Sequence, residues 1–247
     1  MTDKAILAEG AVALVTGASA GIGRAVAASL SARGARVICA ARRQDRLATL
    51  VSELPNPALA LEFDIADGDM VDNLLACLPE EWRRIDILIN NAGHDLGGRQ
   101  PYHQREADDV ATVIQTNVTG MMRATLAVLP EMRERGWGHI VNIGSTNGDE
   151  WVANHSVYVA SKFAVHGFTN SLRQELQGSG VRLTEIRPGL VRSEFAAARW
   201  GGDEARAEKF YERFNAFLSP EDVAEAVLYA LDTPTHVNIC DLVLRPA

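Results

Sequence analysis

Three polar side chains stand at a spacing that suits proton transfer. Tyr158 and Lys162 are four residues apart, which places them one turn apart on the same face of a helix. Ser145 lies thirteen residues before Tyr158, at the end of an apolar segment, and Asn117 lies in a long helical pattern further upstream. A phenol has a pKa of about 10, and a nearby ammonium group favours its ionised form. Because a Tyr-x-x-x-Lys match is common by chance, its meaning depends on the surrounding elements.

A second candidate site begins with closely spaced glycines near the N-terminus. An apolar segment leads directly into this glycine turn, and a helical pattern follows it. Glycines let the backbone turn tightly and approach a pyrophosphate, whose charge is favoured at a helix N-terminus. The spacing is G-x-x-x-G-x-G, which differs from the common G-x-G-x-x-G pattern. The residues that we expect to contact a dinucleotide in this turn are Gly17, Ser19, Gly21, Ile22 and Gly23.

The end of the second apolar segment predicts which dinucleotide binds. An NAD site places an acidic residue there to accept from the ribose 2′-hydroxyl. Here Ala41 stands at that position, and Arg42 and Arg43 follow it. A guanidinium group binds a phosphate through charge-assisted hydrogen bonds. We therefore predict NADP(H) as the cofactor, with Arg42 as the main ligand of the 2′-phosphate; two solvated surface arginines are the alternative.

Short apolar segments alternate with amphipathic ones along the whole chain. The predicted strands are 12–16, 36–41, 59–64, 86–90, 139–143, 182–187 and 238–244. The predicted helices are 21–33, 44–53, 67–77, 105–135, 155–178 and 219–231. This alternation predicts an α/β fold, namely a Rossmann-type doubly wound parallel sheet of about seven strands with helices on both faces. Because no linker divides residues 1–247, we expect a single domain.

Further candidates follow the third and fourth predicted strands. Ligands of open α/β sheets bind outside the carboxyl ends of the strands. Asp64 and Ile65 stand at one such end, where Asp64 could accept from an adenine amino group. Asn91, Ala92 and Gly93 stand at the next, where small residues allow close approach of a cofactor.

The stretch from about 192 to 217 departs from the regular alternation. It is polar and contains two consecutive glycines. Long insertions at the carboxyl edge of a sheet are often functional, so we expect a substrate lid here; a plain surface excursion is the alternative.

Composition excludes several classes of function. The chain has 24 Lys and Arg against 32 Asp and Glu, a net charge of −8, which argues against nucleic-acid binding. No apolar run reaches the roughly 18 residues of a membrane span. The first ten residues do not resemble a signal peptide. Three widely spaced cysteines predict free, mostly buried thiols and no metal site. We therefore expect a cytoplasmic protein.

Together these motifs resemble one family over essentially the whole chain. The segments TGASAGIG, NNAG, YVASK and RPG, together with Asn117 and Ser145, stand in the order and spacing of the short-chain dehydrogenase/reductase family. The resemblance implies an oxidoreductase that acts on CH–OH groups by hydride transfer. It also implies a homo-oligomer, with a tetramer built on the long helices favoured.

The resemblance also implies roles for individual residues. Tyr158 is the general acid/base, Ser145 hydrogen-bonds the reacting oxygen, and Lys162 lowers the pKa of Tyr158 and holds the nicotinamide ribose. Asn117 supports a water molecule that links Lys162 to solvent. The segment that contacts the nicotinamide carboxamide contributes Pro188, Gly189, Val191 and Ser193.

The C-terminal third resembles the NADP-dependent 3-hydroxy acid (serine-type) dehydrogenase branch of this family. This branch implies a small alcohol or carbonyl substrate of the 3-hydroxy acid, hydroxyaldehyde or polyol type. The candidate pocket residues are His94, Asn147, Glu150, Trp151, Arg192, Arg199 and Trp200. An arginine in the lid could pair with a substrate carboxylate, whereas Glu150 would disfavour one. A 3-oxoacyl thioester reductase and a non-catalytic NADP-sensing regulator are the alternatives.

Overall fold

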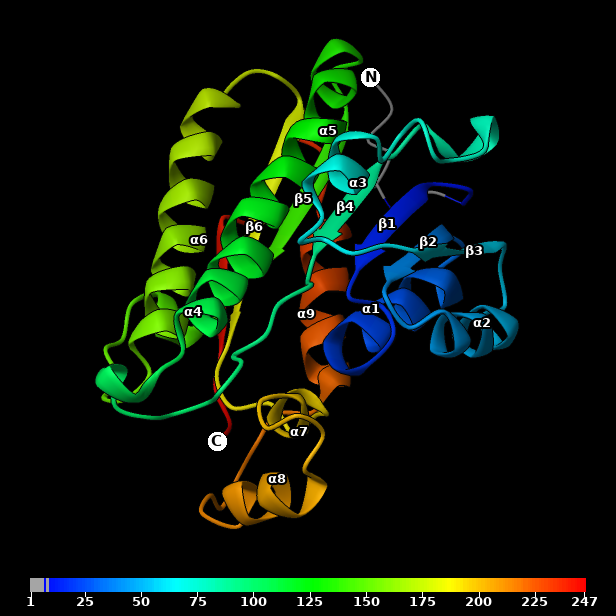
Figure 1. Ribbon diagram of the computed structural model, residues 1–247. Helices are drawn as coiled ribbons and strands as arrows, with labels where there is room; N and C mark the ends of the chain where they lie inside the picture. The colour runs from blue at the N-terminus through cyan, green and yellow to red at the C-terminus, as the bar shows by residue number, and fades with distance from the viewer. Residues whose placement is uncertain (1–6, 8) are drawn as a thin grey trace.

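Seven parallel strands form the sheet at the centre of the molecule (Figure 1). The computed structural model describes residues 7 and 9–247. The strands are β1 (Val12–Thr16), β2 (Arg36–Ala41), β3 (Ala58–Glu62), β4 (Ile87–Asn90), β5 (Gly138–Ile143), β6 (Val181–Pro188) and β7 (Asp241–Leu244). Their order is β3-β2-β1-β4-β5-β6-β7, and all neighbouring pairs are parallel. The predicted doubly wound sheet is confirmed.

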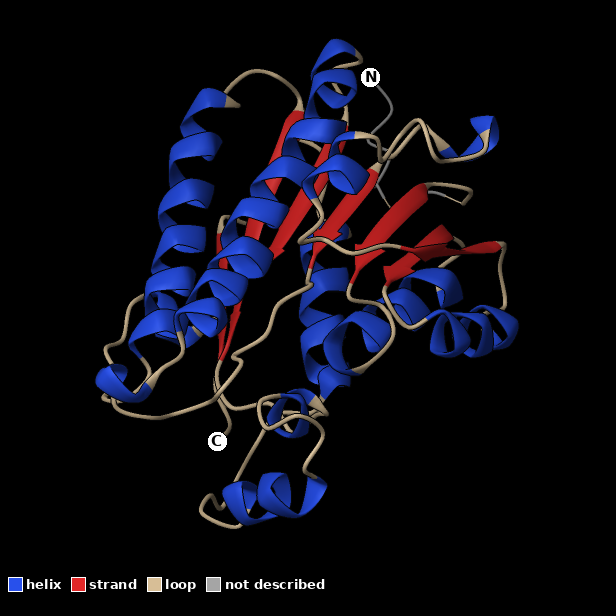
Figure 2. Cartoon of the chain, viewed as in Figure 1, coloured by secondary structure: helices blue, strands red, loops and turns tan. Residues whose placement is uncertain are grey.

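Helices cover both faces of the sheet (Figure 2). One face carries α1 (Gly21–Ala32), α2 (Gln44–Glu53) and α9 (Pro220–Leu231). The other carries α3 (Gly68–Asp72), α5 (Met121–Glu134) and α6 (Ser156–Glu175). Strands β1, β4 and β5 are buried along their whole length, which explains why they read as continuous apolar runs.

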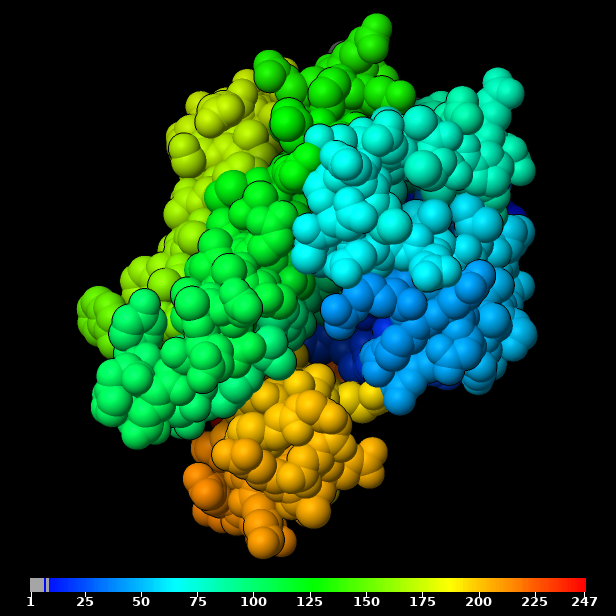
Figure 3. Space-filling view, viewed as in Figure 1, coloured from blue at the N-terminus to red at the C-terminus, as the bar shows by residue number. Residues whose placement is uncertain are grey.

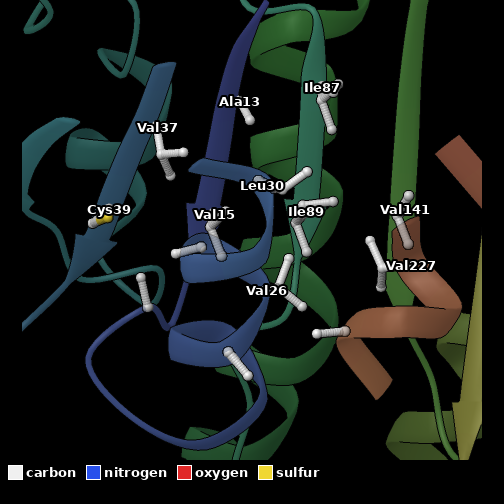
Figure 4. Close-up of a cluster of buried hydrophobic side chains, with 14 of the residues drawn as sticks. Ala13, Val15, Val26, Leu30, Val37, Cys39, Ile87, Ile89, Val141 and Val227 are labelled. Carbon is white, nitrogen blue, oxygen red and sulfur yellow. The ribbon is translucent and has the colours of Figure 1, made fainter. Parts of the chain in front are cut away.

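The core between the sheet and α1 and α9 consists of aliphatic side chains (Figure 4). Val15 of β1 and Ile89 of β4 face Val26 of α1, and Val227 of α9 closes the cluster beside Val141. Burying an aliphatic side chain of this size stabilises a fold by about 1.5–3 kcal/mol. This packing fixes the position of α1, whose N-terminus faces the glycine turn.

Two predicted helices differ from the structure. The predicted helix 105–135 is interrupted, because α4 (Ala107–Ile114) passes through a π-helical turn (Gln115–Gly120) before α5 begins. Such turns are rare and occur frequently at functional sites. The predicted helix 67–77 ends as α3 at Asp72, where the Asn73 amide donates to the carbonyl of Asp69 and completes the last turn.

Two predicted strands are shorter than expected. Strand β3 ends at Glu62 because the carboxylate of Asp64 accepts from the Ala66 amide and starts a turn. Strand β7 begins only at Asp241, because Asn238 donates its side-chain amide to the Leu183 carbonyl instead of extending the ladder.

The carboxyl ends of the strands face a small helical segment (Figure 1). Residues 192–217, here called the α7–α8 segment, contain α7 (Phe195–Ala198) and α8 (Glu204–Tyr211). The segment has its own apolar cluster of Ala196, Ala207, Phe210 and Tyr211. Figure 3 shows the surface hollowed between this segment and the body of the molecule. Single 3₁₀ turns lie at Glu80–Trp82, Tyr102–Gln104 and Thr146–Gly148.

The exposure of the cysteines differs from the expectation drawn from the sequence. All three cysteines are free, but only Cys39 is buried, while Cys77 and Cys240 are exposed; the expectation of mostly buried thiols is therefore wrong for two of them. Most of the first ten residues, on which the signal-peptide expectation rests, lie outside the described residues. Among the helices of the described chain, none combines the length and apolarity needed to cross a bilayer.

Candidate active site

The glycine turn between β1 and α1 has the geometry that an anion site requires. Gly17 and Gly21 have positive φ angles of 68° and 51°, and a Cβ atom on Gly23 would overlap the Gly17 carbonyl. Helix α1 starts after Ala20, and no described side chain caps it. The amide groups of its first turn therefore remain available to an anion. The turn fits the diphosphate of a dinucleotide.

Asn91 fastens this turn to the end of β4. Its side-chain Nδ2 donates to the Thr16 carbonyl at 2.9 Å, and its backbone amide donates to Thr16 Oγ1 at 3.0 Å. The Ala92 amide donates to the same hydroxyl at 3.1 Å. Because β1 and β4 lie where the strand order reverses, these bonds tie the two sides of the switch point together.

The two arginines after β2 differ in their surroundings. Arg43 donates to the hydroxyl of Ser19 in the glycine turn, from Nε at 3.1 Å and from Nη2 at 2.9 Å. Its Nη1 also lies 3.5 Å from a carboxylate oxygen of Glu194, which pairs with Arg46 as well. Arg42 is exposed and forms no hydrogen bond or ion pair within the described part of the chain. Its guanidinium is therefore free to bind a phosphate beside the turn.

The remaining predicted cofactor residues line the same edge of the sheet. Ile65 is buried against Gly120, whereas the Asp64 carboxylate bonds the Ala66 amide. Ser193 lies beside Gly21 and donates its amide to the hydroxyl of Tyr211 at 3.0 Å. The other positions follow strand ends or begin α1: Ile22, Gly93, Pro188, Gly189 and Val191.

Ser145, Tyr158 and Lys162 come together at the carboxyl end of β5. Lys162 is buried, and its Nζ donates to the Ile143 carbonyl at 2.8 Å. The same Nζ lies 5.7 Å from the centre of the Tyr158 ring. Ser145 stands two residues after the end of β5, close enough to the Tyr158 phenol to lower its pKa. The structure therefore unites the three side chains that the sequence separates by up to seventeen residues.

The environment shifts the pKa values of both titratable members. Burial lowers the pKa of Lys162 to about 8, and the carboxylate of Glu185 opposes this shift. Burial, together with the negative charge of Asp95, raises the pKa of Tyr158 to about 12, against smaller opposing effects of Ser145 and Arg199. Burial of the phenol has the largest effect on this pKa, and the expected lowering by Lys162 stays a prediction.

This shift has a direct spectroscopic consequence. A phenol with a pKa of about 12 is protonated at neutral pH and ionises only as the pH approaches that value. Subtracting the ultraviolet phenolate absorbance of a Tyr158→Phe variant from that of the wild type isolates this one ionisation. We expect the difference to stay flat up to about pH 10, the pKa of a free phenol. A titration of Tyr158 near neutrality would contradict the electrostatic role assigned to burial and Asp95.

Asn117 lies in the π-helical turn, where it organises the loop after β4. Its Oδ1 accepts from the His94 amide at 2.9 Å, and its Nδ2 donates to the His94 carbonyl at 2.9 Å. Nδ2 also donates to Ser161 Oγ at 3.1 Å. The His94 ring contacts the Thr116 hydroxyl, and burial together with the charge of Arg42 lowers its pKa.

Three predicted pocket residues are engaged with partners other than Tyr158. Arg192 binds both carboxylate oxygens of Glu208 at 2.7 and 2.8 Å on the exposed side of the α7–α8 segment. Glu150 pairs with Arg245 near the C-terminus. Trp151 is 85% exposed and stacks on Phe163. The adjacent motifs made them candidates, but their side chains point elsewhere.

The other pocket candidates lie close to the acid–base group. Asn147 donates its amide to Ser145 Oγ, and its side-chain Nδ2 contacts Nδ1 of His155 at 3.1 Å. Arg199 is buried, and its guanidinium lies over the Phe195 ring, which in turn contacts Tyr158 edge to face. Trp200 packs beside Arg199 and against Phe210.

Two buried residues beside Tyr158 escaped the sequence analysis. The imidazole of His155 stacks on the Tyr158 ring with centroids 4.8 Å apart. Asp95 lies 2.7 Å from His155 Nε2 and 3.0 Å from Arg199 Nε, and it is only 1% exposed. Their only sequence signal is proximity to the two motifs, because Asp95 follows His94 and His155 precedes Tyr158 by three residues.

A dinucleotide-type glycine turn and a clustered Ser–Tyr–Lys set on one doubly wound sheet define a dehydrogenase of the short-chain class. The short chain dehydrogenase family matches residues 11–203, and the chain belongs to this family.

Among its relatives are two named enzymes and one solved structure. An NADP-dependent 3-hydroxy acid dehydrogenase of Escherichia coli K12 is 44% identical over 95% of this chain and 94% of the relative. Sulfoacetaldehyde reductase 2 of Chromohalobacter salexigens is 40% identical over 95% of this chain and 94% of the relative. The closed form of a serine dehydrogenase complexed with NADP+ superimposes with a TM-score of 0.90 and 44% identity, covering 94% of both chains. The predicted family is thereby confirmed.

Proposed function

We propose that this chain is an NADP(H)-dependent dehydrogenase that interconverts a small 3-hydroxy acid and its carbonyl form. The observation that carries the proposal is the Ser145–Tyr158–Lys162 set, with Ser145 and Lys162 buried and Tyr158 half-buried, which lies at the sheet edge shared with the glycine turn. The NADP dependence of relatives more than 40% identical confirms the predicted cofactor. Their named substrates support a 3-hydroxy acid as the substrate class.

The proposed reaction needs one proton and one hydride. The nicotinamide of NADP(H) supplies or accepts the hydride when it is bound. Tyr158, which is protonated at neutral pH, donates its proton to the carbonyl oxygen during reduction. Ser145 hydrogen-bonds the same oxygen and stabilises the charge that develops on it.

Lys162 and Asn117 support this proton transfer. We propose that Lys162 holds the nicotinamide ribose and keeps a positive charge near the phenol, since its ammonium already lies against the Tyr158 ring. Asn117 bridges the loop after β4 and Ser161, one residue before Lys162. This placement supports its proposed role in holding a water molecule that links Lys162 to solvent.

Arg199 is the residue that we propose binds the acidic group of the substrate. Its Nη1 is buried without a hydrogen-bond partner among the described residues. A buried donor without a partner is costly, and a carboxylate satisfies a guanidinium in bidentate geometry. The Phe195 ring contacts both Arg199 and Tyr158, which supports the α7–α8 segment as a lid over the substrate.

We also propose a homo-oligomer, with a tetramer favoured, in the cytoplasm. Helices α5 and α6 share an apolar groove lined by Met122, Leu126, Leu129, Phe168 and Leu172, and Leu126 is 68% exposed. An exposed apolar face of this kind supports association through these helices, which sedimentation velocity can test. The free cysteines are consistent with a reducing compartment.

The test of the proposed function compares an acid with its neutral ester. 3-Hydroxypropanoate and its methyl ester are oxidised with NADP+ or NAD+, and acetoacetyl thioester is reduced with NADPH in parallel. We expect NADP+ to be preferred and kcat/KM for the acid to exceed that for the ester about tenfold, the effect of one charge-assisted hydrogen bond. Turnover of the thioester alone would favour a 3-oxoacyl thioester reductase instead.

A further inference from the structure

Asp95 lies where three segments of the site meet. It belongs to the loop after β4, and its neighbours Arg199 and His155 belong to the α7–α8 segment and to the residues before α6. We propose that Asp95 is a positioning residue that orients Arg199 toward the acidic group of the substrate and so determines the preference for acids. This inference rests on the proposed function, because it assumes that Arg199 binds that group.

The loop that carries Asp95 is built against Arg199. The Gly97 amide donates to the Arg199 carbonyl at 3.1 Å, and a Cβ on Gly98 would lie 2.7 Å from the Arg199 side chain. Arg105 donates to the carbonyls of Leu96 and Gly98 from within the loop. Backbone and side chain of Arg199 are therefore both held by the same loop.

A line of polar contacts connects Asp95 to the proposed acid–base group. The Asn147 amide donates to Ser145 Oγ at 3.1 Å, and Asn147 Nδ2 donates to Nδ1 of His155 at 3.1 Å. The remaining proton of a neutral His155 then lies on Nε2, which donates to Asp95 at 2.7 Å. Because the His155 ring also stacks on Tyr158, the carboxylate of Asp95 has a fixed position relative to the phenol.

Charge and burial show what Asp95 does for Arg199. The side chains of Asp95, Arg105 and Arg199 are at most 8% exposed, so one carboxylate serves two buried guanidinium groups. Arg105 Nη2 is farther away, at 3.9 Å, than Arg199 Nε, at 3.0 Å. Nε of Arg199 lies 3.0 Å from Asp95 as an ion pair without a hydrogen bond. Nε and Nη1 are both buried without a hydrogen-bond partner among the described residues, and the two buried positive charges are only partly compensated. An anionic substrate group supplies both the missing acceptor and the missing charge.

The experiment measures the ratio of kcat/KM for 3-hydroxypropanoate to that for its methyl ester in four variants. These are Asp95→Asn, Asp95→Glu, Arg199→Met and the double variant Asp95→Asn/Arg199→Met. We expect Asp95→Asn to lower the ratio about tenfold, through a higher KM for the acid. The lost charge also acts on Tyr158, but it does so equally with both substrates, so that effect cancels in the ratio. Asp95→Glu, which keeps the charge, should recover part of the ratio. Asp108→Asn, at an exposed position of α4, is the matched control and should leave the ratio unchanged.

The double variant separates positioning from a purely structural role. If Asp95 acts through Arg199, adding Asp95→Asn to Arg199→Met changes the ratio by less than about twofold. Equal losses for acid and ester in Asp95→Asn, or a further loss of the ratio in the double variant, would overturn the inference. Should Asp95→Asn fail to fold, the comparison of Arg199→Met with the double variant, which removes both charges of the pair, decides alone. An unchanged ratio in Arg199→Met would instead contradict the proposed function of Arg199.

Discussion

Replacing Tyr158 by phenylalanine is expected to lower kcat about 10³-fold, within the range by which general acid–base groups contribute to catalysis. The variant removes the phenolic hydroxyl beside Ser145 and keeps the ring that stacks on His155. The substrate carbonyl would then lose its proton donor, while the shape of the pocket is preserved. Steady-state turnover of NADPH with the aldehyde of the preferred acid measures the effect.

Binding of NADPH provides the control for this variant. The phenol lies outside the glycine turn, so the Kd for NADPH, measured by its fluorescence, should stay within about twofold of wild type. Tyr229→Phe changes an exposed phenol on α9 and should leave both kcat and Kd unaltered. Undiminished turnover of the Tyr158 variant would refute the proposed mechanism. A wild type that binds NADPH but turns over no carbonyl would point to a sensing role.

Replacing Arg42 by alanine is expected to raise the KM for NADPH about 100-fold, which corresponds to about 2.7 kcal/mol of binding free energy. Arg42 is exposed beside the glycine turn, without a described partner, whereas Arg43 is already bonded to Ser19. A charge-assisted pair with the 2′-phosphate is available to NADPH and not to NADH. Parallel KM measurements with the two cofactors distinguish this contact from general damage to the site.

The KM for NADH should change by less than about twofold in the same variant. Arg33→Ala is a suitable control, because Arg33 is a similarly exposed arginine that pairs with Asp232 at the far end of α1. Equal increases of KM for NADPH and NADH would show that Arg42 supports the turn or the adenosine and does not read the 2′-phosphate.

Sequence patterns predicted the sheet well because its strands are buried on both faces. The sequence segments of β1, β4 and β5 contain few polar residues. A strand that is buried on both faces requires such a continuous apolar segment, so it can be recognised from sequence. Element ends were less predictable. Strand β3 stops where the carboxylate of Asp64 accepts a hydrogen bond from the Ala66 amide. Strand β7 starts late because the side-chain amide of Asn238 donates to the Leu183 carbonyl of β6. Side-chain hydrogen bonds that compete with the strand ladder in this way do not change the hydrophobic periodicity of the sequence.

The candidate site divides in the same way. Glycine spacing and the four-residue interval between Tyr158 and Lys162 are local features, so the sequence displays them directly. The Asp95–His155–Arg199 cluster joins residues up to 104 positions apart, and only tertiary packing brings them together. Arg192 shows the opposite case, since its place in the α7–α8 segment suggested a ligand, while the structure pairs it with Glu208 at the surface. The pKa of Tyr158 likewise depends on burial, which the four-residue spacing of Tyr158 and Lys162 does not reveal.

The pairing of β1 with β4 has a consequence for how this protein folds. Val12 donates its amide to the buried carboxylate of Asp86, 74 residues later in the chain, just before β4. The two halves of the sheet join only when β1 and β4 have paired. The chain loses the entropy of closing this large loop before the contacts between the two strands stabilise it. Parallel sheets with such long-range pairings therefore fold slowly. The glycine turn is fastened through the same junction by Asn91. Recovery of dinucleotide binding during refolding therefore reports the late, long-range step and not the early formation of helices.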